Sequence, residues 1–169
     1  MKRLSWIPVS RRQSRLFLGE KEVASLEFSG GHSSLAVAKS AKGNWTLKRS
    51  GFLRPKITAR RAGSVSNYAV VAMNWSGGGR LQIEGGQRFR ISRSGFLRPQ
   101  LVVRDSSEKV LVSLKVHPRT GDAMVLVKGV SDLSEQDCLF AILAWYSIIL
   151  TMKYENDAGT MAAIVAVVG

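Results

Sequence analysis

Basic side chains are the residues whose types and spacing most clearly indicate a chemical role in this sequence. They gather around a hexapeptide, SGFLRP, which occurs at Ser50–Pro55 and again at Ser94–Pro99. Arginine and lysine attract phosphate groups, and each basic residue near a membrane contributes roughly 1 kcal/mol to the binding of anionic lipid. The residues that we expect to hold an anionic lipid headgroup are Lys48, Arg49, Arg54, Lys56, Arg60, Arg93, Arg98 and Arg104.

The positive charge is concentrated in the first part of the chain. The formal net charge is +13, and residues 1–61 hold 14 basic and 3 acidic side chains, residues 62–127 hold 9 and 4, and residues 128–169 hold 2 and 5. A basic surface of this kind attracts anionic lipid, acidic proteins or nucleic acid. The alternative is that outward arginines only keep a β-sheet surface soluble and discourage edge-to-edge pairing.

Nucleic acid matches the sequence less well than the other two partners. The aromatic residues Trp45, Trp75 and Phe89 fall at inward-alternating positions or at strand ends, so exposed stacking platforms between arginines are not evident. The sequence contains no helix-turn-helix or RNA-binding signature. We therefore expect anionic lipid, or an acidic protein partner, ahead of nucleic acid.

The sequence lacks the patterns of catalysis and of metal binding. His32 and His117 stand among glycine, serine and proline, with no cysteine or carboxylate cluster near either. The lone cysteine, Cys138, lies in an apolar segment and is interpreted as a small buried hydrophobic residue. The glycine-rich run Ser76–Arg80 precedes a strand pattern and lacks the Lys-Ser/Thr of a P-loop. We expect a non-enzymatic binding protein without a cofactor.

A helix is predicted over Leu133–Met152, and its residues from Cys138 to Met152 are all uncharged. Its capping box would pair Asp132 with Glu135 or Ser134 with Asp137. Apolar residues cover every side of this helix, so it must be buried all round, in a protein core or in lipid. The uncharged stretch spans roughly 22 Å, whereas a bilayer core is roughly 30 Å thick, which favours a core helix over a membrane span.

Before this helix, short runs alternate apolar with polar or basic residues and are separated by turns. The run Val110–Val116 is an example, and the pattern is typical of antiparallel strands with one buried face. About 12 such runs indicate a barrel or sandwich, and a closed barrel of that size is too wide for side chains alone to fill. The predicted fold is therefore all-β with one central helix: a closed antiparallel barrel around the C-terminal hydrophobic helix.

The hexapeptide adds an internal symmetry to this prediction. Its glycine permits a bend and its proline removes a backbone donor, so each copy is expected to form a corner between two strands. Two equivalent corners indicate two related halves of one barrel. An open sandwich whose helix enters the membrane is the alternative architecture.

Several short stretches resemble a known superfamily. They are the Gly51–Pro55 corner, the Ile83–Gly86 turn before Phe89–Ile91, and Leu143–Tyr146 within the helix. Together with the order of elements they look like the tubby C-terminal-like fold, shared by tubby proteins, phospholipid scramblases and LURP-one-related proteins, and in particular like its small bacterial members. The resemblance covers roughly residues 15–152.

The resemblance implies a function without assigning its residues. Tubby members bind membrane phosphoinositides through basic side chains, but no position of this chain is matched to those residues. Scramblase-like members use a calcium-binding acidic stretch beside the helix. The nearest equivalents here are Glu155 and Asp157, which are too few ligands for a calcium site.

The expected organisation is a basic N-terminal segment (1–14), a tubby-like barrel (15–152) with its central helix, and an apolar C-terminal tail (153–169). The first residues are basic but lack an apolar stretch, so a secretory signal is not expected and a cytoplasmic location is. The leading hypothesis is peripheral association with anionic phospholipid through a basic outer face, helped by the tail Ala158–Gly169. A scaffold that binds an acidic protein and a membrane-anchored protein are the alternatives.

Overall fold

A β-sheet closes on itself around a helix in the computed structural model of this chain. The structure describes residues 1–95, 98–129 and 132–168, with side chains as far as Lys153. The elements of this described part are β1 (Lys2–Pro8), β2 (Gln13–Leu18), β3 (Lys21–Phe28), β4 (Ala36–Ser40), β5 (Gly43–Ser50), β6 (Lys56–Arg61), β7 (Ala69–Met73), β8 (Gly79–Ile83), β9 (Arg88–Ser94), β10 (Gln100–Arg104), β11 (Val110–Val116), β12 (Ala123–Val127) and α1 (Glu135–Val168).

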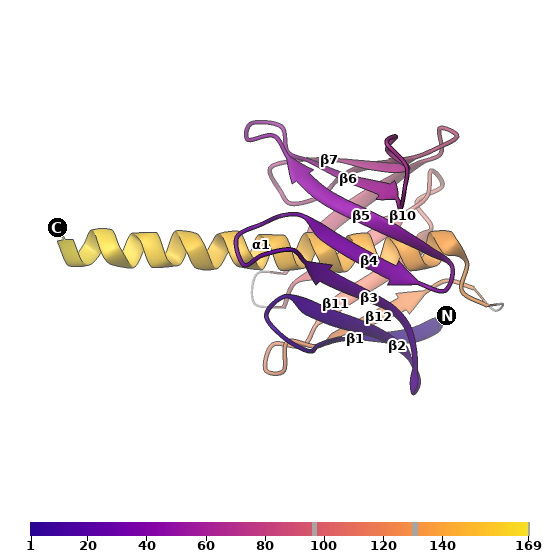
Figure 1. Ribbon diagram of the computed structural model, residues 1–169, viewed down its shortest axis with the longest axis horizontal. Helices are drawn as coiled ribbons and strands as arrows, with labels where there is room; N and C mark the ends of the chain where they lie inside the picture. The colour runs from indigo at the N-terminus through magenta and orange to yellow at the C-terminus, as the bar shows by residue number, and fades with distance from the viewer. Residues whose placement is uncertain (96–97, 130–131, 169) are drawn as a thin grey trace.

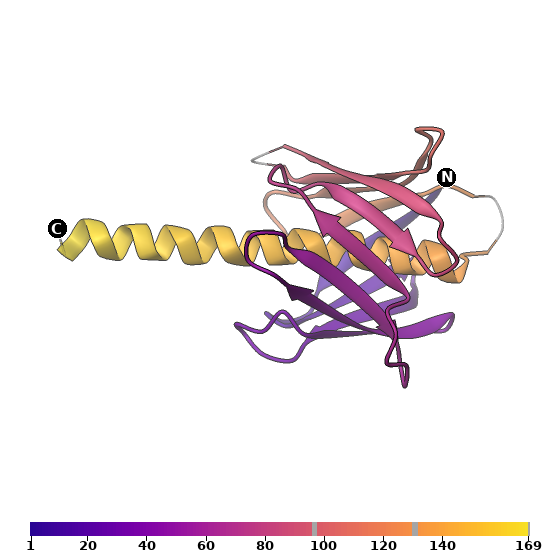
Figure 2. The ribbon, with the colours of Figure 1, turned by 90° about the horizontal axis from the view of Figure 1, so that it is seen from above.

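The strands form one antiparallel barrel in which each pairs with its neighbours in the chain. β1 pairs with β2 on one side and with β12 on the other, and this last pairing closes the barrel. Figures 1 and 2 show α1 running through the middle of the barrel, with strands on all sides of it. The predicted fold class, a closed antiparallel barrel around a C-terminal hydrophobic helix, is confirmed.

Alternation along the strands fills the space between sheet and helix. In β5, for example, Trp45 and Leu47 are fully buried while Lys48 is exposed. Because successive strand residues point to opposite faces, the apolar set of every strand faces the helix. Every residue of α1 from Cys138 to Ile148 is buried, which explains why this helix is apolar on all sides.

Aromatic residues form specific contacts between the sheet and the helix. Trp6 stacks on Trp145 with ring centroids 6.0 Å apart, and its indole Nε1 donates a hydrogen bond of 3.2 Å to the carbonyl of Ala141. Phe28 stacks on Tyr146 at 5.5 Å, and the Tyr146 hydroxyl donates to the carbonyl of Ser34 at 2.5 Å. Pairs of this kind stabilise a core beyond the area they bury, so they fix how far α1 is threaded through the barrel.

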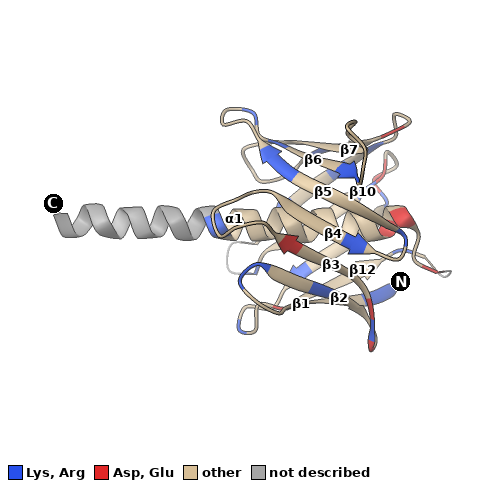
Figure 3. Cartoon of the chain, in the orientation of Figure 1, with Lys and Arg blue, Asp and Glu red and all other residues tan. Residues whose placement is uncertain are grey.

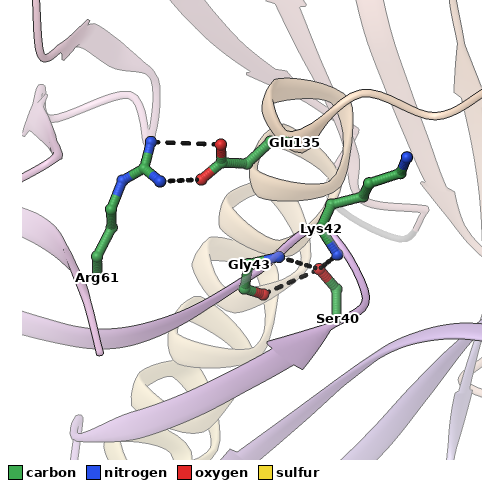
Figure 4. Close-up of polar contacts among 5 residues, drawn as sticks. All are labelled: Ser40, Lys42, Gly43, Arg61 and Glu135. Atoms are coloured by element: carbon green, nitrogen blue, oxygen red, sulfur yellow. Dashed lines mark hydrogen bonds and ion pairs between the residues drawn. The ribbon is translucent and has the colours of Figure 1, made fainter. Parts of the chain in front are cut away.

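Polar contacts fix the first turn of α1 at one end of the barrel. Ser134 and Asp137 form the capping box, each accepting the other's backbone N–H at 3.0 Å. The Arg61 guanidinium meets both carboxylate oxygens of Glu135, at 2.8 and 3.3 Å (Figure 4). Close to this pair, Gly43 of β5 packs against the Glu135 carboxylate, where an added Cβ would come within 3.1 Å of its Oε1. The helix is therefore tied to β5 and β6.

The bounds of the helix differ from the predicted Leu133–Met152. The helix begins at Glu135 because Ser134, rather than Asp132, is its N-cap. It continues to Val168, past the hydrophilic residues after Met152 that were expected to end it. The side chains of 154–169 lie outside the described residues, so the role of the tail Ala158–Gly169 stays a prediction.

The N-terminal segment belongs to the barrel. Residues 1–14 were set apart as a basic segment, yet they contain β1, whose Leu4 and Trp6 are buried in the core. β1 pairs with β12 over Lys2–Trp6, so the barrel starts at Lys2 and not at residue 15. A short strand was expected near Trp6–Val9, but β1 begins earlier, at Lys2, where the basic residues Lys2 and Arg3 gave the chain the look of a charged terminal segment.

The two ends of the barrel are distinguished by the direction of α1. The end at which Glu135 begins the helix is called the entry end, and it is formed by residues 19–20, 41–42, 62–68, 84–87, 105–109, 128–129 and 132–134. The other end, where α1 passes Lys153, is called the exit end. It is formed by the described residues of the loops 9–12, 29–35, 51–55, 74–78, 95–99 and 117–122.

The two hexapeptides form equivalent loops at the exit end, between β5 and β6 and between β9 and β10. Gly51 and Gly95 both have left-handed backbone angles, with φ of 82° and 77°. A Cβ added to Gly51 would lie 2.6 Å from the carbonyl oxygen of Arg54, and one added to Gly95 would come even closer to that of Arg98. The repeat thus encodes one tight turn twice, and Phe96 and Leu97 of the second copy lie outside the described residues.

Replacing these glycines tests the turn geometry. We expect Gly51→Ala and Gly95→Ala each to lower the free energy of unfolding by about 2 kcal/mol or more, because a left-handed residue costs roughly 1–2 kcal/mol and the clash adds to it. Gly19→Ala is the matched control, since Gly19 also has a positive φ, of 61°, but has open space around its Cβ position. Urea denaturation of the three variants measures the difference, and equal losses would contradict the proposed clash.

Candidate functional site

Basic residues form a continuous row on the outer wall of the barrel. Backbone pairing places Lys56 and Arg80 on either side of Ala72. Arg80 lies opposite Arg90, and Arg90 lies opposite Arg104. Side chains that face each other across neighbouring strands are roughly 5 Å apart at Cβ. Lys56, Arg80, Arg90 and Arg104 therefore form one line across β6 to β10, which we call the outer basic row.

Like charges in this row repel one another. Arg80 and Arg90 are directly opposite, an arrangement that destabilises a sheet unless counter-charges are near. Arg90 is paired with Glu108, and Arg104 donates a hydrogen bond of 2.6 Å to the Ser92 hydroxyl. Lys56 and Arg80 are exposed. An anionic ligand laid along the row would relieve the remaining repulsion.

The row lies on a wall that is richer in basic residues than the opposite wall. Lys48 and Arg88 are further exposed basic residues of β5 and β9, and the basic colour on β5 and β6 is visible in Figure 3. On the opposite side, the hairpin β2–β3 mixes both charges, since Arg15 pairs with Glu22 at 3.5 Å. The basic residues of the wall that carries the row are therefore less balanced by acidic neighbours than those of the hairpin β2–β3.

The remaining predicted site residues do not all join the row. Arg60 lies on the outer face of β6, but its Nε donates a hydrogen bond of 2.9 Å to Asn67 near the entry end. Arg54 and Arg98 are exposed in the two equivalent loops of the exit end. The eight predicted residues thus divide between the outer wall and the exit end, and they do not form a single patch.

Arg49 and Arg93 were expected on the basic outer face and are found elsewhere. The alternation that turns Trp45 and Leu47 inward also turns Arg49 inward, and Arg93 follows the buried Ile91 in the same way. Both arginines are half-buried and line one pocket at the exit end. They lie at the mouth of the barrel, which is its opening at the exit end. The apolar core ends before the last inward position of β5 and of β9, and the two arginines occupy these positions.

Sequence reasoning missed four residues of these surfaces. Arg80, Arg88 and Arg90 were left out of the predicted site, although the alternation of Arg80–Gln82 and of Arg88–Arg90 was a usable signal for their outward position. Trp75 was placed at a strand end and not treated as an exposed platform, but it lies beyond the end of β7 and is 93% exposed. The assumption that exposed aromatic residues are lacking is therefore wrong at this position.

The other residues with chemical potential are dispersed. Within the described residues, no three His, Cys, Asp or Glu side chains come close enough to hold a metal ion. His32 and His117 are exposed, and the Nδ1 of His117 interacts with the hydroxyl of Thr120 at 3.3 Å. Cys138 is buried in α1, and burial raises the pKa of its thiol. This agrees with its interpretation as a small buried hydrophobic residue.

Comparisons with known proteins leave the family open. No protein-family model matches this chain, and neither a curated protein nor a solved structure does. The resemblance to the tubby C-terminal-like superfamily therefore stays a prediction. In the part of the chain that the structure describes, no helix is both long and apolar enough to cross a bilayer.

The burial of Cys138 gives a direct test of the helix position. The thiolate is the form that attacks the disulfide of a thiol reagent, and both the raised pKa and the surrounding barrel lower the availability of this thiolate in the folded state. We expect the native thiol to react with Ellman's reagent at least about 100-fold more slowly than the unfolded thiol at the same pH, because reaction requires opening of the barrel. Rapid labelling of the native protein would show that α1 is not held inside.

Proposed function

We propose that this barrel is a non-enzymatic module that binds anionic membrane lipid from the surface of the bilayer. The observation that supports this most is the outer basic row, in which Arg80 and Arg90 face each other across adjacent strands. A planar array of phosphate groups can neutralise several such side chains at once, whereas a single small anion can reach only one or two of them. The row follows the hydrogen-bonding direction across five strands and so matches an extended anionic surface.

The resemblance to tubby-like proteins supports the same proposal. The tubby members of that superfamily bind phosphoinositides through basic side chains, and the barrel with a central helix that they share is the architecture found here. An acidic protein partner is the second candidate, since the same row would attract carboxylates. The two differ in the partner that relieves the repulsion within the row.

Sedimentation with vesicles tests this proposal. We expect the protein to bind vesicles of phosphatidylcholine mixed with phosphatidylserine, to lose this binding in high salt, and to ignore phosphatidylcholine alone. The combined variant Lys56→Gln, Arg80→Gln and Arg90→Gln should weaken binding roughly 100-fold, since each lost charge contributes roughly 1 kcal/mol.

The matched control removes the same charge from other strands. Arg3, Lys39 and Lys115 are exposed on β1, β4 and β11, and their combined replacement by glutamine should leave most of the vesicle binding intact. An equal loss in both variants would point to net charge and not to the row. Absence of binding to anionic vesicles by the folded native protein would rule out the lipid proposal and favour an acidic protein.

A further inference from the structure

We propose that this protein inserts one corner of its exit end into the bilayer, and that Phe52, Leu53 and Trp75 are the side chains that enter the lipid. The corner consists of the turns 51–55 and 74–78, which connect β5 to β6 and β7 to β8. The inference rests on the proposed function, because it assumes that the protein meets a bilayer. It goes beyond that function by adding an apolar anchor to the basic wall and by fixing how the barrel is oriented on the membrane.

Large apolar side chains are exposed to solvent at this corner. Phe52 is 94% exposed, Trp75 is 93% exposed and Leu53 is 72% exposed. Among the other described residues, only Met1 and Val65 are large apolar residues with a comparable exposure, and they lie apart, at the start of the chain and in the turn after β6. Contact of apolar surface with water is unfavourable, so three such side chains in two adjoining turns indicate a surface that binds lipid or another protein.

The two turns of the corner lie beside each other. The backbone N–H of Met73, at the end of β7, donates a hydrogen bond of 3.0 Å to the carbonyl of Pro55, at the end of the turn 51–55. Phe52, Leu53 and Trp75 all line the same pocket at the exit end. The three side chains therefore form one apolar cluster, which can be covered by a single surface.

The outer basic row begins beside this corner. Lys56 is the first residue of β6 and directly follows the turn 51–55, and Arg80 is the second residue of β8, after the turn 74–78. Both side chains are exposed. At a bilayer surface, lysine and arginine stay at the level of the phosphate groups, while tryptophan is enriched at the boundary with the acyl chains. The corner and the row can therefore contact the same bilayer if the barrel tilts toward the wall of β6 to β8.

The charge around the corner favours an anionic bilayer. The sequence from Phe28 to Ile83, which contains β4 to β8 and the turns between them, has nine basic residues and no aspartate or glutamate. The turns of the entry end, by contrast, contain acidic residues such as Glu20, Glu84 and Asp105. An anionic membrane would therefore attract the corner with its wall and repel the entry end.

The direction of α1 favours the same orientation. The helix leaves the barrel at the exit end (Figures 1 and 2). The uncharged tail Ala158–Gly169, which was expected to help membrane association, therefore follows from the end that we place against the lipid. A bilayer at the entry end would leave this tail on the far side of the barrel.

A second copy of this chain and nucleic acid are the competing occupants of the corner. Two copies that met at their corners would bring two strongly basic walls together, which repel each other. Bases could stack on Phe52 and Trp75, but the aliphatic Leu53 offers no ring for stacking. We therefore commit to a bilayer with anionic headgroups, because it offers acyl chains to the apolar cluster and phosphate groups to the basic wall.

Tryptophan fluorescence with brominated lipids tests insertion directly. Trp6, Trp45 and Trp145 are buried inside the barrel, so Trp75 is the tryptophan that acyl-chain bromine can reach. We expect quenching when the protein binds anionic vesicles whose acyl chains carry bromine. The variant Trp75→Phe should still bind these vesicles but lose the quenching, which assigns the signal to Trp75.

Removing the apolar side chains without changing the charge tests the anchor. The double variant Phe52→Ser with Leu53→Ser should weaken binding to anionic vesicles roughly 30-fold, which corresponds to about 2 kcal/mol, because the inserted apolar area is lost. Both side chains are exposed, so thermal unfolding should show native stability. Val65→Ser is the control, since Val65 is 91% exposed at the entry end, and this variant should bind as the native protein does.

The outcomes separate insertion from the proposed function. Salt-sensitive binding to anionic vesicles with unquenched Trp75, and with native affinity in the Phe52→Ser, Leu53→Ser variant, would overturn insertion and leave the outer basic row as the contact. Failure of the native protein to bind any vesicle would remove the proposed function itself. A dimer that forms without lipid and is lost in the double variant would assign the corner to self-association, and binding of a single-stranded oligonucleotide that is lost in the double variant would assign it to nucleic acid; either result would overturn the proposal.

Discussion

The interior of a twelve-stranded barrel must be filled, and this requirement governs the rest of the structure. A barrel of this width leaves a space that inward side chains alone cannot occupy, and an empty apolar cavity would be costly. α1 occupies that space, with residues such as Ile142 and Tyr146 fully buried. The core therefore depends on the last element of the chain, and its closure depends on the pairing of β1 with β12. Both ends of the sequence must be present before the apolar interior is sealed.

Filling the barrel with one helix also makes its two ends different. At the entry end, the helix N-terminus needs polar partners, and Ser134, Asp137 and the ion pair of Glu135 with Arg61 supply them. At the exit end the helix continues, so no cap is needed and the last inward positions of the strands can be charged. Arg49 and Arg93 occupy such positions.

Most of the fold could be predicted from the sequence because its signals are periodic. Alternation in runs such as Val110–Val116 reflects a sheet with one buried face, and the apolar residues from Cys138 to Ile148 reflect burial on all sides. The helix start was ambiguous because Asp132 and Ser134 offered competing caps. The strand β1 was partly hidden, since a short strand flanked by basic residues resembles a charged terminal segment.

The site was harder to predict because periodicity fails where strands end. Alternation assigns a residue to the inside or the outside, but it does not say where the core stops. Arg49 has the inward register of β5 yet lies at the open end of the barrel. Trp75 continues the inward alternation of Ala69 and Val71 in β7, yet it lies in the turn after that strand. The repulsion between Arg80 and Arg90 could not be predicted from the sequence either, because it depends on which residues of β8 and β9 pair with each other. These features depend on the length and register of each strand, which a single sequence specifies weakly.

The repeat shows how one local signal can serve both the turn and the site. The shared sequence extends by one residue beyond the hexapeptide, since an arginine precedes it in each copy, at Arg49 and at Arg93. Around the barrel, the hairpin β7–β8 lies between the two copies, so its tip, with Trp75, stands between the two arginines. The glycine of each repeat fixes the turn, and the turn fixes which residue is the last inward one. A shift of one residue would move each arginine to the outer wall. The mouth is therefore defined by the same register that seals the core.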